Sequence, residues 1–358
     1  MAQTYFVTGA TGFIGRRLAQ RLLHSGARVR LLVRSEARAA DLQALGAEII
    51  VGDLFCEDAI ARGVRECDAV LHLAGLTREQ KRGDFQRVNV LGTRAIADAC
   101  RRADRVPTLV YVSSLASAGR APRAEPTDAN ERYGANRLMR ETDAPRPISS
   151  YGRSKYDAEQ ALLTYALETP ITIVRPPYVF GEGDLVSAKL YAMAKRRGNF
   201  VVPGWKDRFY SFVYVDDLVD VLLASVDCGE RLTPNSLELI ADAPERCSGV
   251  GIYFASSPRP IRFSEFGRFV GRAYGREKMR IFKIPPLGVL GAGAWGEFVK
   301  SIFHCVPSFD WNKSIEALRG PWICSSAKAR DQLGVELKDD LALQFAAAAR
   351  WYEEQGMA

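Results

Sequence analysis

The first third of the chain alternates between short apolar runs and longer segments with helical periodicity, and this alternation restricts the fold more than any other feature. The apolar runs occupy 5–7, 29–33, 48–51, 69–73 and 108–112. Strands separated in this way by helices form a parallel sheet with helices on both faces. We therefore expect an α/β fold of the Rossmann type, a doubly wound parallel sheet that binds nucleotides at the carboxyl ends of its strands.

A glycine-rich turn follows the first of these strands. Gly9, Gly12 and Gly15 have the spacing Gly-x-x-Gly-x-x-Gly and lead into the first helical segment. Glycine lets the backbone approach a pyrophosphate closely, and the positive end of the helix dipole favours the negative charge. A tight turn without a ligand would also use glycines, but the position between the first strand and the first helix favours a dinucleotide site.

The residues after the second strand bear on the choice of cofactor. An acidic residue there would bind both ribose hydroxyls of NAD(H), whereas this sequence has Arg34, followed one turn later by Arg38. A guanidinium group matches the charge and geometry of a 2′-phosphate. The sequence therefore predicts NADP(H), with NAD(H) as the alternative if Arg34 is only a surface residue.

Six short motifs follow one another along the chain. They lie at 8–15, 52–54, 72–75, 89–93, 175–181 and 213–218. In this order and spacing they resemble the extended short-chain dehydrogenase/reductase superfamily, that is, the NAD(P)-dependent epimerase/dehydratase family. Within it the chain looks most similar to the dihydroflavonol-reductase-like and 3β-hydroxysteroid-dehydrogenase-like members.

The resemblance implies a set of cofactor-binding residues. Asp53 would contact the adenine, residues 72–75 would lie along the cofactor, and residues 175–181 would cover the nicotinamide. Asn89 either orders part of the site or satisfies nearby backbone groups. The full expected set is Gly9, Thr11, Gly12, Phe13, Ile14, Gly15, Arg34, Asp53, Leu54, Leu73, Ala74, Gly75, Asn89, Tyr151, Lys155, Pro176 and Val179.

Tyr151 and Lys155 are the expected catalytic pair, one helical turn apart on one face. A phenol with a pKa of about 10 is a poor acid or base at neutral pH, and a neighbouring ammonium group stabilises the phenolate. Tyr151 would then donate a proton to a carbonyl or remove one from an alcohol. Tyr133 has Arg137 at the same spacing, but a guanidinium group does not replace the point charge of lysine.

The superfamily also places a serine after the fifth strand, where it hydrogen-bonds the substrate oxygen. Counting back from 118–119 identifies Ser114 as this residue. Ser113 is the competitor, and its side chain would point to the opposite face of the strand end.

Two tyrosines bear on the substrate. Tyr178 and Tyr210 stand where nucleotide-sugar enzymes of the superfamily often carry an asparagine and a diphosphate-binding arginine. A charge-assisted phosphate contact contributes about 1.5–3 kcal/mol, so aromatic replacements favour a less charged ligand, although Arg208 could partly compensate. We expect NADP(H)-dependent carbonyl reduction or secondary-alcohol oxidation of a relatively apolar small molecule that contacts Ser114, Tyr178 and Tyr210.

Two other functions stay open. One is nucleotide-sugar epimerisation or dehydration, which uses the nicotinamide transiently. The other is a non-catalytic dinucleotide-binding sensor or assembly subunit. That reading is less favoured because such proteins typically lose the tyrosine or the lysine, and this chain has both.

The resemblance and the strand count predict two lobes. Residues 1–180 would form most of the cofactor domain, and 206–232 would return to it. Residues 181–205 and 233–358 would form a smaller, mainly helical substrate lobe.

Composition limits the other partners. The net charge of +7 comes from scattered arginines, and the cluster at 195–197 is too short for a nucleic-acid groove. Three histidines and seven cysteines lack metal-ligand spacing, so we expect no metal site and reduced thiols in the cytoplasm.

The first expected strand follows closely on Met1, so no secretory signal is expected. Residues 285–306 are apolar but interrupted by glycine, proline and charged residues, which argues against a membrane span. Contact with a membrane surface stays open, as does a homodimer.

Overall fold

The computed structural model describes residues 2–79, 81–124, 133, 136–303 and 311–358. Seven parallel strands form its central sheet in the order β13-β6-β5-β4-β1-β2-β3. These strands are β1 (Thr4–Thr8), β2 (Arg28–Val33), β3 (Glu48–Val51), β4 (Ala69–His72), β5 (Thr108–Val112), β6 (Ile171–Arg175) and β13 (Ile252–Phe254). The expected Rossmann-type fold is confirmed.

Helices cover both faces of this sheet because successive strand residues point to opposite faces. Val7 of β1 belongs to one apolar cluster, with α1, α2 and α8, whereas Phe6 belongs to the other, with α3, α4 and α6. The helices around the sheet are α1 (Phe13–His24), η1 (Glu36–Ala39), α2 (Ala40–Ala44), α3 (Glu57–Val64), η2 (Gln86–Leu91), α4 (Gly92–Arg102), α5 (Leu115–Ala118), α6 (Ser150–Leu163) and α8 (Val215–Asp227).

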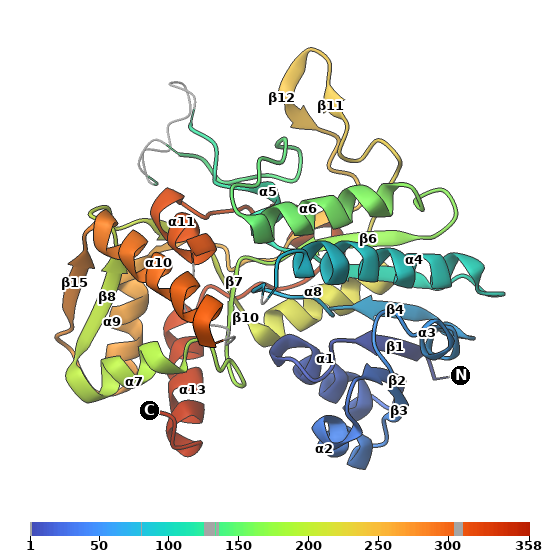
Figure 1. Cartoon of the computed structure of the whole chain (residues 1–358), viewed down its shortest axis with the longest axis horizontal. Coiled ribbons are helices and arrows are strands. Elements are labelled where there is room, and N and C mark those ends of the chain that lie inside the picture. Colours follow the sequence, from blue (N-terminus) through green and yellow to red (C-terminus); the bar gives the residue numbers. More distant parts are fainter. Residues whose placement is uncertain (1, 80, 125–132, 134–135, 304–310) are drawn as a thin grey trace.

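A smaller lobe lies beside the sheet, to the left in Figure 1, with β7 (Tyr178–Phe180) and β10 (Phe212–Tyr214) between the two parts. Its core is aromatic, and the rings of Phe180 and Phe345 stack with centroids 4.1 Å apart. Its other elements are α7 (Ala188–Arg197), β8 (Asn199–Pro203), β9 (Phe209–Tyr210), β14 (Ile261–Arg262), α9 (Phe263–Ala273), β15 (Arg280–Ile284), α10 (Pro286–Phe303), α11 (Trp311–Arg319) and α13 (Leu341–Glu354). A separate two-stranded sheet joins β11 (Leu239–Ile240) and β12 (Ala243–Cys247).

The expected assignment of all of 233–358 to the smaller lobe is wrong in two places. β13 pairs in parallel with β6 and completes the edge of the central sheet. α12 (Ala327–Leu333) packs on the same sheet, with Ala329 and Leu333 in the cluster that contains Val7. Three strand residues carry too short a periodic pattern for the sequence to reveal β13.

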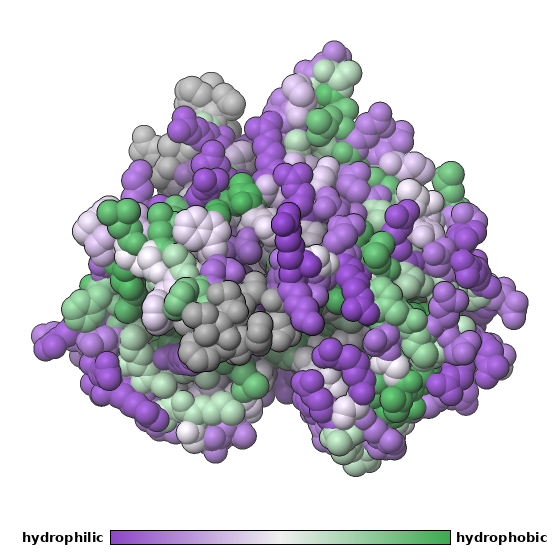
Figure 2. Space-filling model, viewed as in Figure 1, coloured by the Kyte–Doolittle hydropathy of each residue, from purple (hydrophilic) through white to green (hydrophobic). Residues whose placement is uncertain are grey.

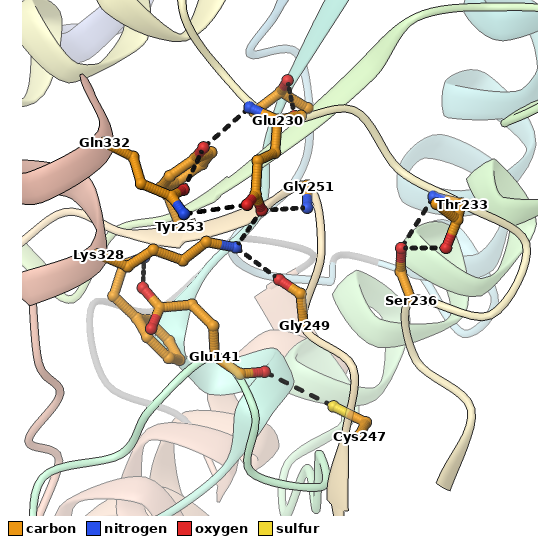
Figure 3. A network of polar contacts seen from close by, with 12 residues as sticks. Glu141, Glu230, Thr233, Ser236, Cys247, Gly249, Gly251, Tyr253, Lys328 and Gln332 are labelled. Carbon is orange, nitrogen blue, oxygen red and sulfur yellow. Dashed lines mark hydrogen bonds and ion pairs between the residues drawn. The ribbon is translucent and has the colours of Figure 1, made fainter. Parts of the chain in front are cut away.

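Polar contacts hold α12 and β13 at the edge of the sheet (Figure 3). Nζ of Lys328, on α12, lies 2.6 Å from a carboxylate oxygen of Glu230 and donates to the carbonyl of Gly249 at 2.8 Å. The hydroxyl of Tyr253, on β13, donates to Gln332 at 2.9 Å. The sheet edge is therefore closed by side chains far apart in the sequence.

α10 covers most of the apolar segment at 285–306, whose residues 304–306 lie outside the described part of the chain. Among the described helices, none combines the length and hydropathy that crossing a bilayer requires.

Candidate active site

The glycine-rich turn after β1 has the geometry of a pyrophosphate site. Gly9 has φ +77°, and a Cβ there would lie 2.7 Å from the backbone nitrogen of Ala74, at the end of β4. A Cβ at Gly15 would overlap the carbonyl oxygen of Gly9. Only glycine permits this packing, which brings the turn, the end of β4 and the start of α1 together.

The N-terminus of α1 suits a negatively charged group. Its N-cap residue is Gly12, no side chain caps the helix, and the first turn contains no acidic residue. The backbone N–H groups and the positive end of the helix dipole are therefore available to an anion. The residues present fit the pyrophosphate of a dinucleotide.

The other expected cofactor residues differ in how far they are exposed to solvent. Arg34 and Asp53 are exposed after β2 and β3, and Gly75 is exposed after β4. Thr11, Phe13, Ile14, Leu73, Ala74 and Val179 are half-buried. Leu54 and Pro176 are buried: Leu54 packs against Gly92, and the Pro176 carbonyl accepts a hydrogen bond from Leu115.

Asn89 fastens the segment after β4 to α6. Its side-chain oxygen accepts from the backbone nitrogen of Leu76 at 2.7 Å, and its Nδ2 donates to Oγ of Ser154 at 2.9 Å. Asn89 is buried, and its amide group is used by these bonds. Its amide group thus satisfies backbone groups of Leu76 and links that segment to α6 through Ser154.

Tyr151 lies in the first turn of α6, where two local features fix its position. Ser149 caps the helix by accepting a hydrogen bond from the backbone nitrogen of Gly152 at 3.0 Å. A Cβ at Gly152 would overlap the carbonyl oxygen of Ala116, so α5 and α6 approach closely. This approach brings Ser114, the N-cap of α5, beside Tyr151.

Opposing effects act on the phenol of Tyr151. Burial raises its pKa above the usual value, whereas the charge of Lys313 and a hydrogen bond from Ser114 lower the pKa. The negative charge of Glu316 also raises the pKa of Tyr151. The pKa of Tyr151 therefore depends on Ser114, which lies beside the central sheet, and on Lys313 and Glu316, which belong to the smaller lobe.

Lys155 is buried one turn further along α6 and is held by β5. Its Nζ donates to the carbonyl of Val112 at 2.8 Å and to the hydroxyl of Tyr111 at 3.1 Å. Burial lowers the pKa of Lys155 to about 8, and the nearby carboxylate of Glu159 opposes this shift. With a pKa of about 8, the Lys155 ammonium group begins to lose its proton just above neutral pH.

Ser113 and Ser114 have different surroundings. Ser113 is buried and its hydroxyl donates to the carboxylate of Glu159, which forms a fully buried ion pair with Arg175 at 2.6 Å. Ser114 is half-buried on the Tyr151 side. The geometry therefore places Ser113 in a buried hydrogen-bond network and Ser114 beside Tyr151, where its hydroxyl also accepts from the backbone nitrogen of Ala116 at 3.1 Å.

Helix α11 supplies residues that the sequence analysis missed. Nζ of Lys313 lies 5.5 Å from the centroid of the Tyr151 ring. Glu316 accepts a hydrogen bond from Oγ of Ser149 at 2.6 Å, and Asn312 accepts one from the backbone nitrogen of Ser150 at 3.1 Å. The only local signal was a lysine three residues before a glutamate, which is typical of any exposed helix.

Tyr178 and Tyr210 lie in aromatic surroundings. The ring of Tyr178 is 5.2 Å from that of Phe212, and its hydroxyl is 2.8 Å from Oγ of Ser187. The ring of Tyr210 is 5.2 Å from that of Phe263. Burial raises the pKa of Tyr210, and the charge of Glu316 adds to this shift as it does for Tyr151, so Glu316 of α11 acts on both phenols.

Metal ligands do not gather in the part of the chain that the structure describes: no three His, Cys, Asp or Glu side chains are placed to share an ion. Among the described residues, the groups that act on the phenol of Tyr151 are Lys313, Ser114 and Glu316.

Comparison with known proteins agrees with this geometry. Residues 5–236 match the NAD dependent epimerase/dehydratase family. The chain is 29% identical to a ceramide reductase of Caulobacter vibrioides, over 98% of this chain and 94% of the relative. It is 30% identical to 4-hydroxy-2-methyl-3-oxo-4-farnesyl-3,4-dihydroquinoline-1-oxide ketoreductase of Stigmatella aurantiaca, over 73% and 70% of the two chains.

The fold is also that of MoeE5 in complex with UDP-glucose and NAD, with a TM-score of 0.71 at 21% identity, covering 98% of this chain and 99% of that one. The resemblance inferred from the motifs is confirmed. The chain therefore belongs to the NAD-dependent epimerase/dehydratase family and is an NAD(P)-dependent oxidoreductase of the extended short-chain dehydrogenase/reductase type.

Proposed function

We propose that the protein uses NADP(H) to reduce a carbonyl group, or to oxidise a secondary alcohol, of a relatively apolar small molecule. NADP(H), when bound, supplies or accepts the hydride. Tyr151 donates the proton to the carbonyl oxygen or removes it from the alcohol, and Ser114 holds that oxygen. Lys155 holds the ribose hydroxyls and, together with Lys313, stabilises the phenolate of Tyr151.

The observation that carries the apolar substrate is the position of Tyr210 and Arg208. Tyr210 packs on Phe263, where a diphosphate-binding arginine would otherwise stand. Nη1 of Arg208 donates to the carbonyl of Lys206 in its own loop at 3.2 Å. Burial raises the pKa of the Tyr210 phenol, and the charge of Arg208 lies close enough to Tyr210 to act against this and lower the pKa. A diphosphate would therefore meet an aromatic ring at the position of Tyr210, and the neighbouring charge of Arg208 is hydrogen-bonded to its own loop.

The names of the two reductases described above point the same way, because ceramide and a farnesyl-substituted quinoline are apolar compounds. The preference for NADP(H) rests on Arg34, which is exposed at the end of β2, at the edge of the sheet where the adenosine ribose would lie.

A substrate comparison tests this proposal. Oxidation of NADPH is followed with a long-chain ketone and, in parallel, with UDP-glucose and other nucleotide sugars, which are also analysed for epimerised or dehydrated products. Turnover of the ketone supports the proposal. Conversion of nucleotide sugars without turnover of any apolar ketone would show that the protein is an epimerase or dehydratase, and tight NADPH binding with no turnover of either class would show a non-catalytic role.

A pair of variants then places the substrate. Tyr210→Ser removes the ring and should raise KM for the ketone several-fold while leaving the Kd of NADPH unchanged. Tyr210→Phe keeps the ring and should retain the wild-type KM. Equal KM values for both variants would remove Tyr210 from the substrate site.

A further inference from the structure

Helix α10 exposes large apolar side chains to solvent, where an ordinary surface helix would expose polar ones. Leu287 is 83% exposed, Trp295 is 66% exposed and Phe298 is 51% exposed. The buried positions of the same helix include Gly293 and Gly296. The buried positions also include Val289, and Gly288 and Gly291 are exposed. Three large apolar groups nevertheless point outward, against the pattern of a helix that has only water on its outer side.

The exposed apolar surface continues onto the neighbouring strand. Phe282 of β15 is 49% exposed, and a Cβ at Gly288 of α10 would meet the side chain of Ile284 at 3.0 Å. The backbone nitrogen of Gly204 donates to the carbonyl of Ile284 at 2.8 Å, which brings Trp205 to the same edge.

We define the apolar face as Trp205, Phe282, Ile284, Leu287, Trp295 and Phe298. Figure 2 shows hydrophobic residues at the left of the molecule, about half-way up, over the region where Figure 1 places β15 and α10.

Charges around the apolar face are mainly positive. The exposed basic residues of the same segments are Lys206, Arg276, Lys278, Arg280 and Lys283. The acidic residues of these segments are fewer: Glu277 is exposed, Glu297 is half-buried, and Asp207 is bonded to Ser264 at 2.6 Å. β8 and β15 pair in register, so the cations at 195–197, which precede β8, lie at the same end of this small sheet as Arg280.

The combination of exposed tryptophan, phenylalanine and leucine with flanking lysine and arginine suits the surface of an anionic membrane. Aromatic and aliphatic side chains are stabilised at the boundary between headgroups and acyl chains, and cations are attracted to anionic headgroups. A second copy of this chain would bring the same cations against one another, whereas an anionic surface would neutralise them. No described helix is able to cross a bilayer, so such contact would be at the surface.

We propose that the apolar face docks the protein on the surface of an anionic lipid membrane. The docked face adjoins the active site through α11, since Oγ of Ser314 donates to the carbonyl of Val289 on α10 and its neighbour Lys313 lies over the Tyr151 ring. Helix α11 therefore contacts both the helix that carries the apolar face and the Tyr151 ring. The proposal concerns the surface alone and does not depend on which substrate the site accepts.

Vesicle sedimentation with the full-length protein tests this. Wild-type protein should sediment with vesicles of phosphatidylcholine and phosphatidylglycerol, bind phosphatidylcholine alone more weakly, and lose affinity for the anionic vesicles as salt is added. The double variant Leu287→Ser, Trp295→Ser should bind the anionic vesicles about tenfold more weakly. Leu167→Ser, which changes an exposed leucine outside the apolar face, is the matched control and should bind as wild type.

Turnover of a water-soluble substrate without vesicles should be the same in all three proteins, which separates docking from catalysis. The proposal is overturned if wild-type protein binds neither kind of vesicle, or if the double variant binds as tightly as the control. It is also overturned if light scattering shows a dimer that the double variant converts to a monomer without any vesicle binding, because the face would then be covered by a second copy.

Discussion

Nζ of Lys313 lies 5.5 Å from the centroid of the Tyr151 ring, and it comes from the smaller lobe rather than from the helix that carries Tyr151. Lys155, on the same helix as Tyr151, is instead hydrogen-bonded to Val112 and Tyr111 of β5. Lys313 thus lies over the Tyr151 ring, whereas Lys155 is bound to the end of β5. Because the two lysines have different partners, we expect different effects from replacing each of them.

Lys313→Met should weaken the stabilisation of the Tyr151 phenolate. Because the charge of Lys313 lowers the pKa of Tyr151, its loss should move the ascending, acid-side limb of the alcohol-oxidation profile to higher pH. A cation–π contact contributes about 0.5–2 kcal/mol, so kcat at neutral pH should fall roughly two- to thirtyfold. Lys313→Arg keeps the charge and should keep the profile; an unshifted profile in the methionine variant would exclude this role.

Tyr151→Phe should remove the proton donor while preserving the fold. General acid–base catalysis contributes about 10²–10⁴-fold, and turnover should fall by that order. The Kd of NADPH, measured by fluorescence, should change little because the glycine turn and α1 are untouched. Tyr156→Phe, on the same helix, is the control and should remain active; comparable activity in both variants would refute the role of Tyr151.

Lys155 should make stability depend on pH. Its pKa is lowered to about 8 in the folded chain from the usual 10.5, so the unfolded chain binds more protons between these values and stability should rise with pH across this window. Lys155→Met abolishes this contribution. The difference in unfolding free energy, variant minus wild type, should therefore fall by roughly 3 kcal/mol from the lower to the upper end of the window.

Urea unfolding of the cofactor-free proteins across this pH range measures the difference. Lys278→Met, which replaces an exposed lysine, should run parallel to wild type. A constant difference for Lys155→Met would mean that the ammonium group is solvated in the folded chain.

Arg34→Asp should reverse the preference between cofactors if Arg34 meets the 2′-phosphate. Losing a charge-assisted phosphate contact costs about 1.5–3 kcal/mol, so the ratio of kcat/KM for NADPH over NADH should fall at least roughly tenfold. Arg28→Asp makes the same charge change at the other end of β2 and should leave the ratio unaltered. If both variants have the wild-type ratio, another residue selects the cofactor.

Local patterns in the sequence were sufficient for most of the fold. β1 to β5 lie where short apolar runs predicted them, because each strand must bury apolar side chains on two faces of one sheet. The glycine turn was predictable for a similar reason, since Gly9 and Gly15 tolerate a backbone approach that any Cβ would block.

Contacts between distant segments were not encoded in any local period. β13 is only three residues long and gains its place by pairing with β6, and α12 is fastened to the same sheet by Lys328. The assignment of these segments from the sequence failed because their burial depends on partners far away in the chain.

The sequence by itself determined the Rossmann sheet, the dinucleotide turn and the spacing of Tyr151 and Lys155, since all of these depend on residues within a few turns or one strand of each other. Only the tertiary structure decided that Lys313 rather than Lys155 lies over the phenol, that Arg208 is bonded to its own loop, and that α10 turns its large apolar side chains outward. The physical reason is that the direction and burial of a side chain are set by the surfaces packed around it, and those surfaces are assembled from segments distant in sequence.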